Sequence, residues 1–156
     1  MGICLSMSVD KGQSCPFWFT KSDSKAFVWY ITEVENGAGA FPNTVGKLVE
    51  HFGIDIKPLL KIGGQDFSIE ELGIDEEEFT KYQESNQAAW QTPQELIDCL
   101  QFFVKKIDDQ PDVFSKLEVE DGYFLRGTFR QDLFDILRMA EWAKESGAEK
   151  LRLEAA

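Results

Sequence analysis

Residues that could act as nucleophiles or bases are scarce in this chain of 156 residues. His51 is the only histidine, so no site can be built from two or more imidazoles. Cys4, Cys15 and Cys99 form no Cys-x-x-Cys pair, which excludes a cysteine-based zinc knuckle and a thioredoxin-type dithiol. A catalytic nucleophile needs an adjacent base, and nothing in the sequence places Cys15 beside His51. We therefore assign no catalytic residue.

Motifs that hold nucleotides or metal ions are missing as well. The sequence contains neither a Gly-x-x-x-x-Gly-Lys-Ser/Thr loop nor a Gly-x-Gly-x-x-Gly fingerprint. Asp108, Asp109 and Asp112 lack the spacing of a calcium loop, and Pro111 interrupts them, so they indicate the end of a helix. With twenty-eight Asp and Glu residues, a carboxylate pair carries no specific signal for acid–base catalysis. We expect no enzyme, no cofactor and no metal site.

One group of residues could bind an anion. Arg126 and Arg130 flank Thr128, which we predict to cap the start of the longest helix. Free backbone N–H groups and the helix dipole favour negative charge at such a position, and arginine adds paired donors. The alternative is that both arginines pair with the protein's own carboxylates, such as Glu118 or Glu120.

Acidic residues are concentrated in the middle of the chain. Sixteen Lys and Arg face twenty-eight Asp and Glu overall, but residues 65–121 alone hold sixteen acids and four bases. The run Glu76, Glu77 and Glu78 is its densest part. Such a surface repels phosphate backbones, so we expect no direct nucleic-acid binding, and it attracts a basic protein. The alternative is that the acidity serves solubility alone.

Two tryptophans are candidate anchors for a partner. Trp18 lies in the run Phe17-Trp18-Phe19, where at least one ring of a strand must face away from the core side. Trp90 lies between two predicted helices. Exposed aromatic side chains at such places anchor protein interfaces; the alternative is that both pack inside the fold.

These observations favour a protein that acts by binding another protein. We predict an acidic protein of the immunity or inhibitor type, or a regulatory adaptor, with a basic protein as its partner. Trp18, Trp90 and Glu76 to Glu78 are the predicted partner-binding residues. The competing hypothesis is a small-molecule binder or an enzyme that takes an anionic ligand at Arg126, Thr128 and Arg130.

The strands that must position these residues are predicted mostly near the two ends of the chain. Residues 3–9 alternate between apolar and small polar side chains, which is typical of a half-buried strand. Residues 17–19 and 26–34 are predicted as two antiparallel strands, although the second run also has helical spacing. Asp121-Gly122 predicts a hairpin over residues 117–126, and residues 151–153 predict a final strand.

The helices are predicted mainly in the middle of the chain and before the final strand. Asn43 begins a helix that Gly53 ends. Asp75 begins another through a capping box with Glu78, and Thr92 begins one through a capping box with Glu95. The longest helix runs from Thr128 to the region of Gly147. We therefore predict a single α+β domain over residues 1–156. Its mostly antiparallel sheet packs against a helical middle region and a long C-terminal helix.

The N-terminal residues allow two interpretations. Gly2 and Cys4 fit a pattern for myristoylation followed by palmitoylation, whereas residues 3–9 favour a strand. The sequence lacks the basic segment and cleavage site of a secretory signal and has no apolar run long enough for a membrane span. Three cysteines without an evident pairing are typical of a reducing compartment, so we expect a cytoplasmic protein.

Overall fold

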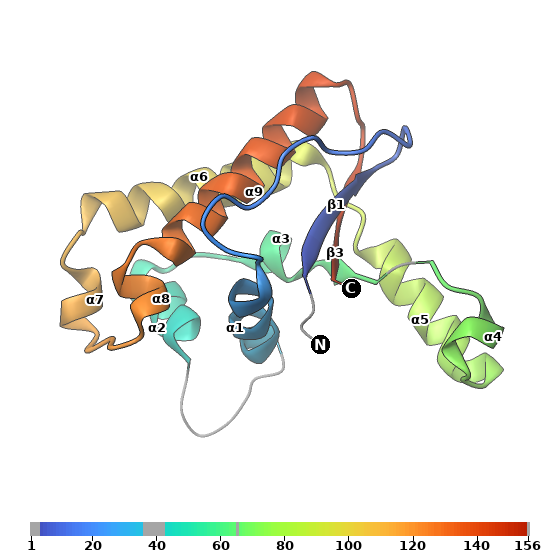
Figure 1. The fold of residues 1–156 in the computed structure, drawn as a ribbon, viewed down its shortest axis with the longest axis horizontal. Helices are drawn as coiled ribbons and strands as arrows, with labels where there is room; N and C mark the ends of the chain where they lie inside the picture. The colour runs from blue at the N-terminus through green and yellow to red at the C-terminus, as the bar shows by residue number, and fades with distance from the viewer. Residues whose placement is uncertain (1–3, 36–42, 65, 156) are drawn as a thin grey trace.

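The computed structural model describes residues 4–35, 43–64 and 66–155. Helices dominate these residues, and a small sheet lies beside them (Figure 1). In chain order the elements are β1 (Leu5–Val9), α1 (Lys25–Glu35), α2 (Thr44–Phe52), α3 (Lys57–Leu60), β2 (Ile62–Gly63), α4 (Ile69–Leu72), α5 (Glu76–Ala88), α6 (Pro93–Asp109), α7 (Val113–Lys116), α8 (Gly122–Leu125), α9 (Thr128–Glu145) and β3 (Leu151–Ala155).

The sheet is mixed and is built around the C-terminal strand. Its order is β1-β3-β2. β1 runs antiparallel to β3, with Leu5 opposite Ala155 and Val9 opposite Leu151, whereas β2 runs parallel to β3. The α+β class and the first and last strands are therefore confirmed. The sheet is not antiparallel throughout, because the chain reaches β2 from α3 in the same direction as β3.

The core lies where α6 and α9 pack side by side and the inner face of the sheet covers them (Figure 1). Apolar side chains at helical spacing along these two helices are buried, including those of Phe103 and Phe129, whose rings meet edge to face with centroids 5.6 Å apart. Alternation in β1 sends Leu5, Met7 and Val9 inward. Burial of these side chains supplies most of the stability.

Helix starts that depended on local chemistry are confirmed. The Asn43 side chain accepts a hydrogen bond from the Gly46 N–H, and Gly53 ends α2 in the left-handed conformation with φ 65°. Thr92 and Glu95 form a capping box at the start of α6. Thr128 does not cap α9. Gly127 occupies the cap position with φ 78°, and Thr128 is the first helical residue.

Two predicted strand regions are wrong. Residues 26–34 lie in α1, because the helical spacing of their apolar side chains buries Phe27, Val28 and Ile31 together. Residues 17–19 form no strand; they belong to an irregular segment, residues 12–24, which we call the strap. The strap crosses α9 on its way from β1 to α1 (Figure 1).

The predicted hairpin over residues 117–126 is also wrong. The Asp121 side chain accepts a hydrogen bond from the Tyr123 N–H and thereby begins α8. This short helix buries Phe124 against Phe129, with ring centroids 5.0 Å apart. Asp-Gly thus acts as a helix start rather than a two-residue hairpin turn, because burying the Phe124 ring requires a helical turn.

The lipidation hypothesis depends on Gly2, which lies outside the described residues, as does Ile3. Among the described residues, no helix combines the length and the apolar character that crossing a bilayer requires.

Candidate functional site

Residues 66–88, which contain α4 and α5, form a projection that we call the arm. In Figure 1 the arm extends away from the body on the far side of the sheet from α7. No residue of α4 is buried, and Asn86 is the one buried residue of α5. None of the arm's apolar side chains belongs to the described hydrophobic core. Packing therefore does not explain why these residues are helical.

Local electrostatics and caps hold the arm in its helical form. Ser68 and Glu71 form a capping box at α4, and Gly73 ends this helix with φ 64°. The Asp75 carboxylate accepts a hydrogen bond of 2.8 Å from the Glu78 N–H at the start of α5. Three glutamates fill the first turn of α5, where negative charge suits the helix dipole. A largely polar helix with one buried residue depends on such contacts.

The base of the arm is fixed by Arg152 of β3. The guanidinium donates two hydrogen bonds to Asp66, of 3.2 and 3.0 Å, and two to Glu154, of 3.0 and 2.7 Å. It also lies over the Trp90 ring, 4.8 Å from the centroid. The Arg152 side chain is only 4% exposed. Hydrogen bonds from Arg152 hold the pKa of the Asp66 carboxyl below its ordinary value, although Asp66 is largely exposed.

The base of the arm is also held by the close approach of the end of β2 to α5. The side-chain amide oxygen of Asn86 accepts a hydrogen bond of 2.9 Å from the Gly64 N–H, which ties α5 to the end of β2. A Cβ atom at Gly63 would lie 3.1 Å from Arg152 Cδ and 3.2 Å from Asn86 Oδ1. A side chain at Gly63 would therefore push against both residues that hold the arm.

Most charge on the arm is left without a counter-charge. The arm holds eight Asp and Glu residues and one lysine. Lys81 lies 3.8 Å from Glu77, and both side chains are largely exposed. Within the described part of the chain, six arm carboxylates take part in no ion pair, those of Glu70, Glu71, Asp75, Glu76, Glu78 and Glu84. The predicted acidic run Glu76 to Glu78 is fully displayed to solvent.

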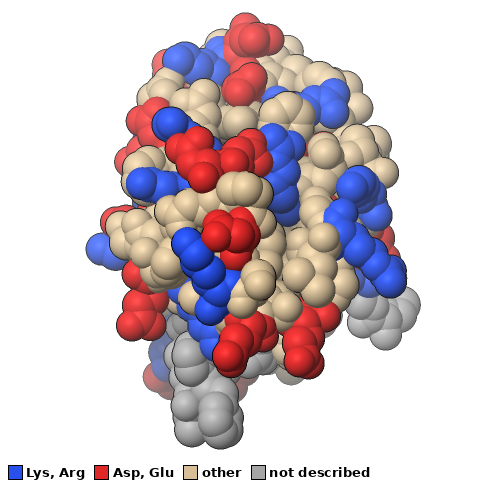
Figure 2. All heavy atoms as spheres, turned by 90° about the vertical axis from the view of Figure 1, so that its left-hand side faces the viewer, with Lys and Arg blue, Asp and Glu red and all other residues tan. Residues whose placement is uncertain are grey.

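Acidic residues elsewhere are interspersed with basic ones. Figure 2 views the side of the molecule that lies opposite the arm, and Lys and Arg side chains alternate there with Asp and Glu. Within the described part of residues 65–121, six carboxylates without an ion pair lie on the arm, and five lie outside it, those of Glu95, Asp98, Glu118, Glu120 and Asp121.

The two predicted tryptophan anchors differ. Trp18 is 74% exposed, so its indole is available to a partner. Trp90 is partly buried, and its ring is covered by the Arg152 guanidinium. The structure therefore gives Trp90 an internal contact at the base of the arm. Sequence reasoning missed Trp29, which is 58% exposed on α1, because its segment was predicted to be a strand.

The residues of the predicted anion site do not come together as a free site. Arg130 donates to both carboxylate oxygens of Asp108, at 3.2 and 2.9 Å, and lies over the Phe134 ring. This pairing is the alternative we considered, with Asp108 in place of Glu118 or Glu120. Arg126 is exposed, and its carbonyl accepts a hydrogen bond from Lys21.

Two buried aspartates of α9 were missed by sequence reasoning. Asp135 accepts hydrogen bonds from the Thr20 N–H and hydroxyl, and Asp132 accepts them from Ser22 and, at 2.5 Å, from Tyr123. Burial raises the pKa of Asp132, and burial together with the bond to Asp132 raises that of Tyr123. These carboxylates fasten the strap to α9. The sequence did contain a signal for them, because Asp132 and Asp135 are three residues apart among the apolar residues of the longest predicted helix.

Comparisons with protein families, with curated proteins and with solved structures found no match for this chain.

Proposed function

We propose that this protein binds a basic protein partner through its acidic arm, as an immunity or inhibitor protein or a regulatory adaptor does. The observation that carries the proposal is the display of unpaired carboxylates on helices that contribute nothing to the core. Such an element adds little to stability by burial. Its charge is available for recognition because, among the described residues, only Asp66 and Glu77 of its carboxylates have a cationic partner.

The proposed mechanism is electrostatic steering followed by docking. Carboxylates that project from the body create a negative potential, which raises the rate at which a basic partner arrives. The anchor at Arg152 holds the arm in place, so less ordering is needed on binding. The same field repels nucleic-acid phosphates, in keeping with the expectation of no direct nucleic-acid binding.

The test is affinity capture from lysate with three forms of the tagged protein. The arm variant carries Glu76→Lys and Glu78→Lys, and the matched control carries Asp109→Lys and Asp112→Lys, with the same change in net charge. We expect the wild type and the control to retain a basic protein at low salt and to lose it at moderate salt. The arm variant should retain much less of it. Identical sets of retained proteins for all three forms would overturn the proposal.

The competing hypothesis of an anionic ligand at Arg126 and Arg130 has weaker support, because Arg130 is paired with Asp108. A rise in melting temperature with millimolar phosphate that Arg126→Ala removes would favour it. The absence of any such rise would leave the arm as the better-supported site.

The proposed complex belongs in the cytoplasm. Cys4, Cys15 and Cys99 are all free cysteines in the structure, and free thiols are typical of a reducing compartment.

A further inference from the structure

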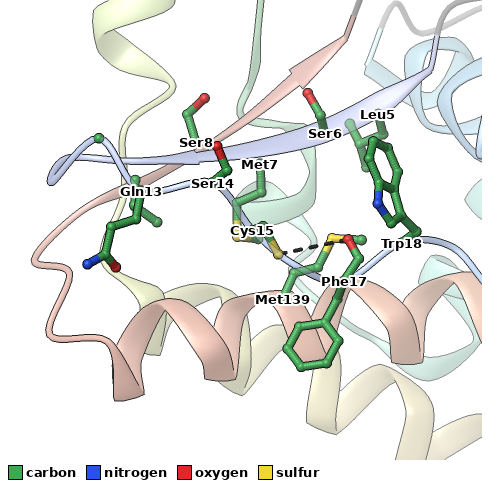
Figure 3. A pocket seen from close by; sticks show the side chains of 12 residues that line it. Leu5, Ser6, Met7, Ser8, Gln13, Ser14, Cys15, Phe17, Trp18 and Met139 are labelled. Atoms are coloured by element: carbon green, nitrogen blue, oxygen red, sulfur yellow. Dashed lines mark hydrogen bonds between the residues drawn. The ribbon is translucent and has the colours of Figure 1, made fainter.

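A groove lies between the edge strand β1 and the first part of the strap. Its volume is about 370 Å³, within the range of small-molecule sites. Figure 3 shows Trp18 beside Leu5 at one end, Gln13 toward the other, and Met139 of α9 beneath. We call it the β1 groove. The residues that line it are Leu5, Ser6, Met7, Ser8, Val9, Gly12, Gln13, Ser14, Cys15, Phe17, Trp18 and Met139.

The lining of the β1 groove carries no formal charge. It consists of apolar side chains, the hydroxyls of Ser6, Ser8 and Ser14, one amide and one thiol. The Cys15 thiol donates to the Phe17 carbonyl at 3.9 Å (Figure 3), and burial raises its pKa, so it stays neutral at neutral pH. A charged ligand would lose water here without gaining a counter-charge. The lining therefore favours an uncharged ligand.

The strap holds the exposed indole of Trp18 in a fixed position. Ser14 pairs with Ser8 of β1 before Trp18, and the Arg138 guanidinium lies 4.6 Å from the centroid of the Phe17 ring. After Trp18, the Thr20 N–H donates to the buried Asp135 at 2.9 Å. Trp18 is thus fastened on both sides while its own ring is 74% exposed. A preorganised aromatic surface of this kind binds with little loss of entropy.

The outer edge of β1 is not open to an added peptide strand. The Leu5 N–H donates to the Ser24 hydroxyl at 2.7 Å, and the Val9 carbonyl accepts from the Gly12 N–H at 3.2 Å. Between them, Ser8 is bridged to Ser14. Strand addition needs a row of free backbone groups. A ligand in the β1 groove would therefore be recognised by side chains and not by backbone pairing. This favours a small molecule over an extended peptide.

We propose that the β1 groove binds an uncharged small molecule with a flat aromatic ring, which stacks on Trp18. The ring would bury the exposed indole face, and the serine hydroxyls and Gln13 amide would orient its polar groups. This site is separate from the arm, so a test of ligand binding in the β1 groove does not depend on whether the arm binds a protein partner.

The test uses three probes that share one ring and differ in charge: indole, indole-3-acetate and tryptamine. Each is titrated to millimolar concentration against ¹⁵N-labelled protein. We expect indole to cause saturable shifts in the amide signals of β1 and residues 12–18, with weaker binding of both charged probes. Trp18→Ala should weaken indole binding by about fivefold or more, whereas the control Trp29→Ala should leave it unchanged.

Three results would overturn the proposal. They are the absence of saturable shifts with indole, tighter binding of a charged probe, and an equal loss in the two tryptophan variants. Both tryptophans are exposed, so neither substitution is expected to unfold the protein.

Discussion

Two short acidic segments look alike in the sequence and differ in the structure. In the arm, Glu76 and Glu78 take part in no ion pair within the described residues. At residues 108–112, which we call the α6–α7 junction, every carboxylate has a cation. The pairs are Asp108 with Arg130, Asp109 with Lys105 and Asp112 with Lys116. Acidic composition therefore does not measure the charge that a surface offers.

The difference arises from what lies next to each segment. The α6–α7 junction belongs to helices that pack against the core, and α9 brings Arg130 across to it. Lysines four residues away on the same helices supply the other two cations. The arm packs against other elements mainly at its base, where β2 contacts α5, and among the described residues Arg152 is the one cation from another element that pairs with it. Because the arm extends away from the body, most of its carboxylates have no ion-pair partner among the described residues.

The largest change in stability is expected when the arginine that pairs with each segment is replaced. Arg152→Ala is expected to lower the free energy of unfolding by about 3 kcal/mol, because Glu154 would remain buried without its partner. Arg130→Ala removes a partly exposed ion pair and should cost below about 1 kcal/mol. Urea unfolding measures both variants. Equal losses would contradict the view that only the arm depends on a buried anchor.

A second test compares the aspartates at two helix starts. Asp75 caps α5, whereas Asp112 makes no capping bond at α7. Asp75→Ala should destabilise α5 by about 1 kcal/mol, seen as faster hydrogen exchange of the α5 amides. Asp112→Ala should change exchange at α7 by less than about 0.5 kcal/mol. Unchanged α5 exchange in the first variant would show that packing, not capping, holds the arm.

A smaller effect is expected from acid titration of Asp66. Its pKa in the folded state lies below the ordinary value of 3.8 because Arg152 donates to it. A lowered pKa stabilises the fold above the ordinary value, and this contribution is lost as pH falls through the lower folded value. Unfolding measured between pH 2 and 6 should therefore show a shallower acid dependence for Asp66→Asn than for the wild type. Parallel curves would contradict this assignment.

The smallest effect concerns ion pairs on helix surfaces. A double-mutant cycle on Glu77 and Lys81 should give a coupling of about 0.3–0.5 kcal/mol, as should the cycle on Lys105 and Asp109. Both pairs are exposed and four residues apart. Thermal unfolding of the single and double variants measures the couplings. A clearly larger value at Glu77 would mean that this pair, rather than the caps, stabilises α5.

Local signals predicted much of the fold. The caps at Asn43 and Thr92 and the apolar stripes of α6 and α9 depend on neighbours within a few residues, so the sequence shows them directly. The hairpin prediction failed because Asp121-Gly122 suits both a hairpin turn and a helix start. What decides between them is the burial of Phe124, whose ring packs against that of Tyr30 in α1.

The candidate site was predictable only in part. The exposed carboxylates of α5 and the exposed Trp18 follow from composition and from an aromatic run. The anchor could not be predicted, because Asp66 and Arg152 are separated by 86 residues and only the fold joins them. One signal was present: Arg152 and Glu154 alternate within a strand and so share one face of the sheet.

The central position of β3 has a consequence for folding. β1 and β2 both pair with β3 and not with each other, so no sheet exists until the last strand is in place. During synthesis β1 is made before its partner β3, and residues 10–150 lie between the two strands in the chain. Closing such a long loop is slow, so we expect the helices to assemble first and the docking of β3 to complete folding. Until then the apolar residues of β1 remain exposed to chaperones.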